Sequence, residues 1–369
     1  MRILHTVEFY EPSKGGAQEV IKQISERLAK RGHDVTVATS YHPDRRDLVI
    51  NSVKIRQFRI QGNNVKGIKG EKQAYQEFLI KTPFDIMLNY AAQAWPTDLT
   101  FPILDKISAK KVFVPLGYSK LNDPGYKGYF EDLPNYLKKY DKLVYPSANY
   151  QDKIFGDRYG VSKKAVIIPN GAGEEFLAQP IGFRKKFGIN TPYMILTVSN
   201  HYFAKGHSFV IEAFQAMRRR DATLVIIGNK PPTHTWYSCW PICKLKSFIN
   251  SRIRIISGIS RPYVVSAYQE ADLFFFGSRV ECAPLVMYES FAAKTPFITT
   301  LVGNVQDHKE VLMIVKTPRK MAEIANYLLE NELKRESLAK KAFSLWQESH
   351  TWETIASRYE AMYQSLLVR

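Results

Sequence analysis

The sequence has no long uninterrupted hydrophobic run and only three cysteines in 369 residues. A helix that crosses a bilayer needs about 18 or more consecutive apolar residues, and no run approaches that length. Three cysteines provide no even framework of disulfides, which favours a reducing cytoplasm. We expect no signal peptide either, because the opening MRILHTVEFY is typical of a first β-strand.

Two nucleotide-binding signatures are also absent. The glycine fingerprint G-x-G-x-x-G does not occur, and no Asp-x-Asp pair is available to hold a diphosphate through a metal ion. Cys239 and Cys243, with His234 nearby, offer three possible metal ligands, but no second pair completes a tetrahedral set. We therefore expect no metal and no bound cofactor.

Positive charge is in excess, with 52 Lys and Arg against 35 Asp and Glu and a formal net charge of +17. Such an excess favours anionic partners, namely phosphorylated substrates, an anionic membrane surface or nucleic acid. The basic residues form short clusters, and each cluster taken singly is better explained as a solvated face. No recognised nucleic-acid motif is present, so nucleic acid is not expected.

Strand-like runs alternate with helical patterns along most of the chain, which indicates an α/β protein built from βαβ units. The series runs from RILHTV to AVIIPNG (165 to 171) and starts again at YMILTVS (193 to 199). We place a domain boundary near residues 172 to 185. The prediction is two doubly wound, Rossmann-like domains that face a central cleft, with ligands bound at the carboxyl ends of the strands.

Lys205 lies in such a strand-end position, in VSNHYFAKGHS (198 to 208), just before a predicted helix. A cation at a helix N-terminus opposes the helix dipole, and a bound anion between them would explain it. Gly15 and Gly16 occupy the corresponding point of the first domain, where glycines let a backbone approach a phosphate or sugar. A solvated lysine and a plain tight turn are the simpler alternatives.

Two glutamates, Glu281 and Glu289, flank the run CAPLVMY. The pattern places Glu281 on the loop that leaves a buried strand and Glu289 in the early turns of the next helix. Carboxylates at strand ends can accept hydrogen bonds from paired sugar hydroxyls. Glu is also favoured at helix starts for electrostatic reasons, so the pair alone is weak support for a sugar site.

The basic segment KPPTHTWYSCWPICK (230 to 244) replaces a simple strand-to-helix loop with aromatic residues, including Trp236 and Trp240. Aromatic side chains in a basic loop suit a membrane interface or a lipid-linked acceptor. Ordinary packing explains them equally well.

Four stretches together resemble the landmarks of the retaining nucleotide-sugar glycosyltransferases of family four, which have the GT-B fold. They are GGAQEVIKQISERLAKRGHDVTVAT, VIIPNG, KGHSFVIEAF and SRVECAPLVMYESFAAKTPFI. The closing TWETIASRYEAMYQ resembles the helix that returns to the N-terminal domain in that fold. The resemblance implies an acceptor domain over 1 to 172 plus 352 to 369, and a donor domain over 173 to 351.

By this resemblance, Glu289 would hold the ribose of a nucleotide sugar, Glu281 the sugar, and Lys205 the diphosphate. The resemblance implies catalysis by Lys205 and Glu281, with further donor contacts from Asn200, from Gly15 and Gly16, and from the backbone at Pro284, Leu285 and Val286. Tyr10, Gly117 and Trp236 complete the site on the acceptor side.

This sequence departs from the family pattern at three places. Asn200 stands where the family usually has an arginine, Cys282 and Pro284 replace glycines, and Leu116 and Gly117 stand where a histidine is common. His201, Lys120 or a lysine of the basic clusters are the candidates to replace the missing cation.

The combined prediction is a cytoplasmic, metal-independent, retaining glycosyltransferase, peripheral at the inner membrane face, that serves surface polysaccharide or glycolipid assembly. Its partners would be a nucleotide-sugar donor, a glycan or lipid-linked acceptor and an anionic membrane surface. The alternatives are a non-catalytic GT-B protein that binds a polyanion, and a sugar-nucleotide epimerase or hydrolase.

Overall fold

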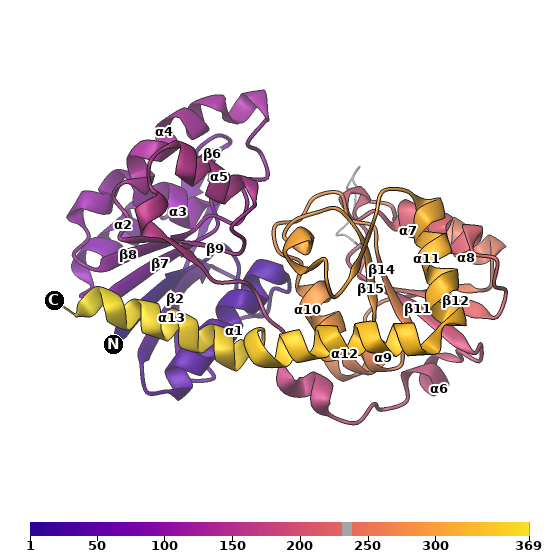
Figure 1. Cartoon of the computed structure of the whole chain (residues 1–369). Coiled ribbons are helices and arrows are strands. Elements are labelled where there is room, and N and C mark those ends of the chain that lie inside the picture. Colours follow the sequence, from indigo (N-terminus) through magenta and orange to yellow (C-terminus); the bar gives the residue numbers. More distant parts are fainter. Residues whose placement is uncertain (231–237, 369) are drawn as a thin grey trace. The chain divides into compact units, whose positions relative to one another are not determined.

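The computed structural model describes residues 1 to 230 and 238 to 368, which form two compact units (Figure 1). The first unit comprises Met1–Asn170 and the chain from Trp352 onward, and the second comprises Gly171–Thr351. The division after Asn170 falls just before the boundary region predicted from the sequence. His234 and Trp236 lie outside the described residues.

The first unit contains an eight-stranded sheet in the order β10-β9-β8-β7-β1-β2-β4-β3. All neighbours are parallel except β3 and β4, which pair antiparallel at one edge. The strands are β1 (Arg2–Thr6), β2 (Asp34–Ser40), β3 (Val49–Ile50), β4 (Val53–Phe58), β7 (Ile86–Tyr90), β8 (Lys110–Val114), β9 (Lys142–Tyr145) and β10 (Ala165–Ile167). A separate hairpin joins β5 (Ile60–Asn63) to β6 (Gly67–Gly70).

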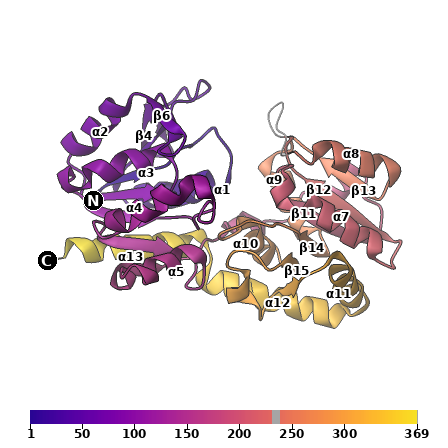
Figure 2. The ribbon, with the colours of Figure 1, turned by 90° about the horizontal axis from the view of Figure 1, so that it is seen from above.

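Helices flank this sheet (Figure 2). They are α1 (Gly16–Lys30), α2 (Lys72–Lys81), α3 (Trp95–Thr100), α4 (Lys127–Leu137), α5 (Gln151–Arg158) and α13 (Trp352–Leu367). An aromatic core joins α2, α3 and α4 to the strands, and Trp95, Tyr75, Phe113 and Tyr140 are among its fully buried members. Burial of these large rings helps to hold the sheet to the helices.

The last helix, α13, packs against α1 through a buried polar contact and an ion-pair cluster. The ring of His5, on β1, lies between Ser25 Oγ at 2.8 Å and Tyr363 OH at 3.0 Å. Nearer the surface, Arg31 pairs with Glu360 at 2.6 Å and with Glu353. The residues from Trp352 onward therefore belong to the first unit although 181 residues of the second unit precede them in the chain.

The second unit contains a fully parallel six-stranded sheet in the order β13-β12-β11-β14-β15-β16. Its strands are β11 (Tyr193–Val198), β12 (Ala222–Ile227), β13 (Ile253–Ile256), β14 (Leu273–Phe276), β15 (Phe297–Thr300) and β16 (Met313–Val315). The strand order reverses between β11 and β14. In an open parallel sheet, this switch point leaves a crevice at the carboxyl ends of the two strands.

Both faces of the second sheet are covered, which explains its nearly continuous hydrophobic strands. Along β14, Phe274 and Phe276 join the core under α9 (Arg261–Gln269) and α10 (Leu285–Ala292), while Leu273 and Phe275 join the core under α7 (His207–Ala216). The other helices of this unit are α6 (Phe183–Phe187), α8 (Trp240–Ile249), α11 (Pro318–Glu330) and α12 (Glu332–Ser349).

The predicted GT-B architecture of two Rossmann-like domains is confirmed, but some element predictions were incomplete. The strand β4 was not predicted, although the alternation of apolar and polar residues in its sequence, VKIRQF, is typical of a half-buried strand. Residues 240 to 244, expected in a loop, begin α8. The closing helical stretch consists of three helices, broken at Asn331 and at His350. Over the described residues, no helix is both long and apolar enough to span a membrane.

His5 makes the stability of the first unit depend on pH. Burial lowers its pKa from 6.5 to about 3, so the unfolded chain takes up a proton below pH 6.5 that the folded chain does not. We expect the stability advantage of the wild type over His5→Gln to shrink by about 1.4 kcal/mol from about pH 7.5 to about pH 5.5. Urea unfolding at both pH values measures this difference.

Comparing the two proteins cancels the opposite contribution of buried carboxyls such as Asp98 and Asp152, which both proteins share. A stability gap that stays the same at both pH values would show that His5 is not a buried neutral histidine.

Candidate active site

The predicted strand-end residues of the second unit gather at the switch point between β11 and β14. Lys205 lies in the loop between β11 and α7, and Glu281 lies in the loop between β14 and α10. Glu289 is the fifth residue of α10. The setting inferred from the sequence for both glutamates, one on the loop and one in the helix, is confirmed.

Lys205 and Glu281 form an ion pair, with Nζ and Oε1 2.7 Å apart. Ser278 Oγ donates to the same carboxylate oxygen at 2.8 Å. The lysine side chain keeps about a third of its surface exposed, and the glutamate is more enclosed. Lys205 is thus the more accessible partner, and Ser278 also holds the carboxylate, which suits a site where an incoming phosphate can compete for the lysine.

Glu289 is nearly buried, with 8% of its surface exposed, and is held on both oxygens. Arg261 Nη1 lies 2.7 Å from Oε1, and Tyr268 OH donates to Oε2 at 2.8 Å. Burial opposes the charge of Arg261, but Glu289 and Glu175 outweigh that effect and raise its pKa above the ordinary value. The carboxylate of Glu289 is thus fixed in one orientation by its two partners.

Arg261 was missed in the sequence, although a signal for it existed. It is the first residue of α9, where a cation opposes the helix dipole as Lys205 does before α7. Without the structure, nothing linked this arginine to Glu289, because 27 residues lie between them in the chain.

A close backbone contact fixes the two loops against each other. Gly206 has a φ of +65°, and a Cβ there would lie 1.7 Å from the carbonyl oxygen of Gly277. The amide of Arg279 also donates to the carbonyl of Ala204 at 2.8 Å. Because no side chain fits between the loops, the positions of Lys205 and Glu281 depend on glycine at position 206.

The N-terminus of α10 faces the same crevice edge. Pro284 is the N-cap residue, Leu285 and Val286 begin the helix, and within the described part of the chain no side chain caps it. Free amides at such a start, together with the helix dipole, favour an anion. The replacement of the family glycines by Cys282 and Pro284 therefore leaves this feature in place.

Asn200 and His201 differ in how they relate to this edge. Asn200 is exposed, and its Oδ1 accepts from the amide of Asn229 at 3.2 Å. His201 is fully buried and turned toward Cys239, so it is not available as the cation that replaces the family arginine. Lys120 pairs with Asp123 in the first unit.

In the first unit, Gly15 and Gly16 lie at the start of α1, as predicted. The backbone of Gly15 is extended, and a Cβ there would meet only the flexible side chain of Gln18. Within the chain itself, neither the backbone conformation nor the space around Gly15 requires glycine. No side chain among the described residues caps α1.

Gly117 lies in a strained loop after β8. Leu116, Gly117 and Tyr118 all have positive φ angles, of 59°, 86° and 51°, which are unfavourable for the two side-chain-bearing residues. The buried carboxylate of Asp152 holds this loop by accepting from the amide of Gly117 at 2.8 Å. Burial raises the pKa of Asp152 to about 6.

Tyr10, the predicted acceptor contact, lies in the interior of the first unit. Its side chain is fully buried, and its carbonyl accepts from Arg45 Nη2 at 3.0 Å.

A carboxylate pair in the first unit was not predicted from the sequence. Glu8 follows β1 and Asp98 lies in α3 after β7, and burial raises the pKa of both, that of Asp98 to about 6. The strands β1 and β7, which these two residues follow, are neighbours at the switch point of the first sheet.

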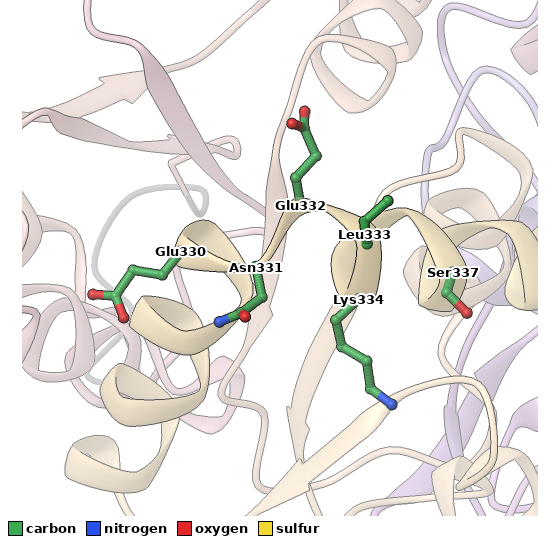
Figure 3. A pocket seen from close by; sticks show the side chains of 6 residues that line it. All are labelled: Glu330, Asn331, Glu332, Leu333, Lys334 and Ser337. Atoms are coloured by element: carbon green, nitrogen blue, oxygen red, sulfur yellow. The ribbon is translucent and has the colours of Figure 1, made fainter.

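Figure 3 shows a surface pocket at the junction of α11 and α12, lined by Glu330, Asn331, Glu332, Leu333, Lys334 and Ser337. Glu332 and Lys334 point in different directions in this view. None of the predicted site residues lines this pocket, and its polar groups do not converge, so it is not the candidate active site.

The contact at Gly206 yields a stability prediction. Gly206→Ala forces both an unfavourable positive φ and a clash with the Gly277 backbone. The matched control is Gly188→Ala, at a φ of +64° with open space around it. We expect the control to lose about 1 to 2 kcal/mol of unfolding free energy, and Gly206→Ala to lose about 1 to 3 kcal/mol more. Denaturant unfolding checks both, and equal losses would contradict the close contact.

Comparison with known proteins assigns each half of the chain to a glycosyltransferase family. The family model described as "Glycosyltransferase Family 4" matches residues 14–175, and the one described as "Glycosyl transferases group 1" matches residues 182–344. The O-antigen biosynthesis glycosyltransferase WclY of Escherichia coli is 24% identical over 62% of each chain. N-acetyl-alpha-D-glucosaminyl L-malate synthase of Bacillus anthracis is 27% identical over 50% of this chain and 49% of its own. The matched part thus spans less than two thirds of either relative.

The fold as a whole is shared with solved glycosyltransferase structures. Sucrose-phosphate synthase from Thermosynechococcus elongatus superposes with a TM-score of 0.81 at 18% identity, covering 99% of this chain and 98% of that one. Anabaena Alr3699/HepE, solved in complex with UDP, gives 0.81 at 14% identity, covering 99% and 100%. With both halves matched by family models and the fold shared along its length, the chain belongs to the family-four glycosyltransferases of the GT-B fold.

Proposed function

We propose that this protein is a retaining glycosyltransferase that moves a sugar from a nucleotide-diphosphate donor to a hydroxyl of a glycan acceptor. The observation that carries the proposal is the arrangement at the switch point of the second sheet. A cation, Lys205, lies beside the carboxylate of Glu281 and near the uncapped start of α10, while Glu289 is held nearly buried. Glycosyltransferases of the same fold support it, since Alr3699/HepE was solved with UDP and with UDP-glucose.

The donor would be held by protein groups at three points. Lys205 and the amides of Leu285 and Val286 would bind the diphosphate, Glu289 the ribose hydroxyls and Glu281 the hydroxyls of the sugar. For this, Lys205 must exchange its 2.7 Å contact with Glu281 for the phosphate. Glu281, still bonded by Ser278, is then free to accept from the sugar.

The proposed chemistry needs no metal at the donor. The oxygen of the acceptor hydroxyl bonds to the anomeric carbon on the face that the leaving group occupies. The bond from that carbon to the phosphate oxygen breaks, and the nucleoside diphosphate leaves with the electron pair. The acceptor proton passes to the departing phosphate, while Lys205 and the helix dipole stabilise its charge.

For the acceptor, we propose a lipid-linked glycan of a surface polysaccharide or glycolipid. A relative named for O-antigen biosynthesis supports this class. The solvent side of α8 adds a physical argument, because Ile242, Leu245, Phe248 and Ile249 are exposed there beside Lys244. Exposed apolar side chains beside lysines suit an anionic membrane surface, and with the net charge of +17 they favour a peripheral position at the cytoplasmic face.

Nucleotide binding tests the donor site. We expect one of UDP, GDP, ADP, CMP or dTDP to raise the melting temperature, with or without magnesium. Glu289→Gln should weaken that nucleotide about tenfold, because a charged hydrogen-bond acceptor for the ribose is lost. Lys205→Ala should lower sugar transfer about a hundredfold or more. Lys334→Ala, an exposed lysine of α12, is the matched control and should behave as wild type.

The alternatives are outcomes of the same experiment. A shift with a DNA duplex alone, abolished by salt, would replace the proposal with a non-catalytic polyanion-binding protein. Free sugar released without an acceptor would indicate a hydrolase, and a changed sugar nucleotide would indicate an epimerase.

Vesicle binding tests the membrane assignment separately. We expect the protein to cosediment with phosphatidylglycerol vesicles at low salt and to be released by salt. Phe248→Glu, at a side chain 90% exposed on α8, should reduce binding several-fold. Leu333→Glu changes an equally exposed leucine on α12 and should leave binding unchanged. Equal binding by all three proteins would exclude α8 as the contact.

A further inference from the structure

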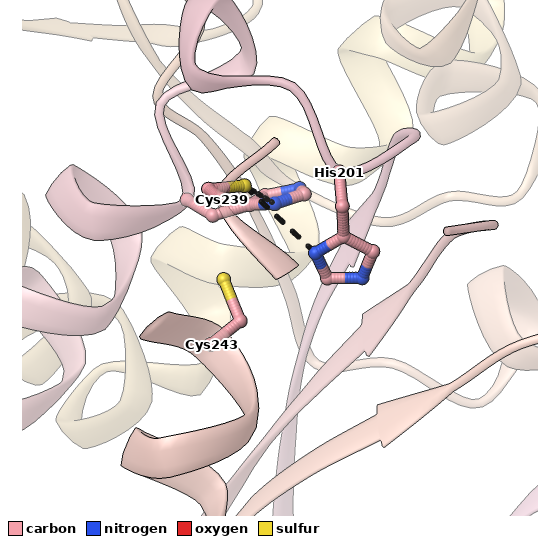
Figure 4. A group of neighbouring side chains, drawn as sticks. His201, Cys239 and Cys243 are labelled. Carbon is pink, nitrogen blue, oxygen red and sulfur yellow. Dashed lines mark hydrogen bonds between the residues drawn. The ribbon is translucent and has the colours of Figure 1, made fainter. Parts of the chain in front are cut away.

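Two histidines and two cysteines of the second unit converge in a buried cluster apart from the proposed donor contacts. It consists of His201, His207, Cys239 and Cys243, all buried, and one candidate ligand atom from each lies within 4.8 Å of every other. His207 Nδ1 is 3.2 Å from Cys239 Sγ, and His201 Nδ1 is 3.9 Å from the same sulfur. Figure 4 shows the imidazole of His201 and the thiols of Cys239 and Cys243 directed toward one spot.

The chemistry and the spacing of these four residues match a structural zinc site. Zinc in such sites is bound tetrahedrally by cysteine sulfur and histidine nitrogen, at about 2.3 and 2.1 Å, which places ligand atoms about 3.4 to 3.8 Å apart. The observed separations of 3.2 and 3.9 Å are close to this range. The histidines are separated by five residues and the cysteines by three, within the spacings common in Cys2His2 sites.

His207 has the outer hydrogen bond that is typical of a metal ligand. Ser199 Oγ lies 2.7 Å from His207 Nε2, so this ring nitrogen can donate to it while Nδ1 presents its lone pair to the sulfurs. Metal-bound histidines commonly have such an outer hydrogen bond. His201 is fully buried, and its Nε2 has no hydrogen-bond partner within the described part of the chain.

The packing of α8 gives an independent reason for a bond at this point. Cys243 is the single buried residue of this ten-residue helix, and Cys239 is its N-cap. The apolar residues Leu245, Phe248 and Ile249 face solvent instead of the core. Apolar burial therefore anchors α8 weakly, and coordination of its two cysteines would tie it to the strand-end loop of β11.

We propose that His201, His207, Cys239 and Cys243 bind one Zn2+ ion as a structural Cys2His2 site. The sequence led to the opposite expectation, because it paired the cysteines with His234 and found too few ligands. His201 lies in the β11–α7 loop and His207 is the first residue of α7, far from the two cysteines in the chain. The site is distinct from the donor diphosphate, so the proposed metal-independent transfer is unaffected.

The inferred ion would also position the proposed donor site. Lys205 lies between His201 and His207 in the chain, so coordination of both histidines would fix the ends of the loop that carries it. Lys205 is not itself a ligand. This effect on Lys205 rests on the proposed function, whereas zinc binding does not.

The test is the metal content of the full chain, purified without a histidine tag and without chelators. We expect elemental (inductively coupled plasma) mass spectrometry to find about one zinc per chain. The Cys239→Ser and Cys243→Ser variants should each hold less than about a tenth of that amount. Cys282→Ser is the matched control, since the third cysteine lies outside the cluster and should leave the zinc content unchanged. This measurement requires no donor, acceptor or activity.

A second measurement on the wild type covers the case in which the cysteine variants do not fold. Protein grown with cobalt in place of zinc should show the thiolate-to-cobalt charge-transfer band and strong visible absorption of a tetrahedral site. Treatment with a chelator should then make two further thiols reactive toward a disulfide reagent and lower the melting temperature. A wild-type chain with no zinc and no cobalt band would overturn the proposal, and so would full zinc in the Cys239→Ser and Cys243→Ser variants.

Discussion

The contact between the backbones of Gly206 and Gly277 is the constraint on which the candidate donor site depends. It joins the loop that leaves β11 to the loop that leaves β14, the two strands between which the sheet order reverses. Lys205 precedes one glycine and Glu281 follows the other, so their 2.7 Å ion pair is a consequence of this contact. A parallel sheet creates an edge where ligands can bind, and here two glycines determine which side chains meet at that edge.

The β11–α7 loop also takes part in a second contact, the cluster of two histidines and two cysteines. Gly206 of this loop contacts Gly277, while His201 of the loop and His207 at the start of α7 lie near the cysteines at the start of α8. A helix with one buried residue and several exposed apolar residues is thereby linked to the loop that would bind the diphosphate. One short segment thus connects the proposed donor, the inferred zinc ion and the surface that we assign to the membrane.

Much of this arrangement could be predicted from the sequence. Parallel strands that are buried on both faces appear in the sequence as apolar runs, and the loops after them carry the polar groups. Lys205, Glu281 and Glu289 were found in this way. Arg261, which orients Glu289, and the histidine partners of Cys239 were not, since these contacts join elements far apart in the chain. The burial of Tyr10 could not be predicted either, because a tyrosine that follows a strand is compatible with both a surface loop and an aromatic core.

The central claim is that Lys205 leaves Glu281 to bind the diphosphate of a nucleotide sugar while Glu289 binds its ribose. The decisive measurement is a crystal structure of the protein with the nucleoside diphosphate that raises its melting temperature. We expect the phosphates to lie between Lys205 Nζ and the first amides of α10, and the ribose hydroxyls to lie within hydrogen-bonding distance of Glu289. A nucleotide bound elsewhere, with the Lys205–Glu281 ion pair intact, would contradict it.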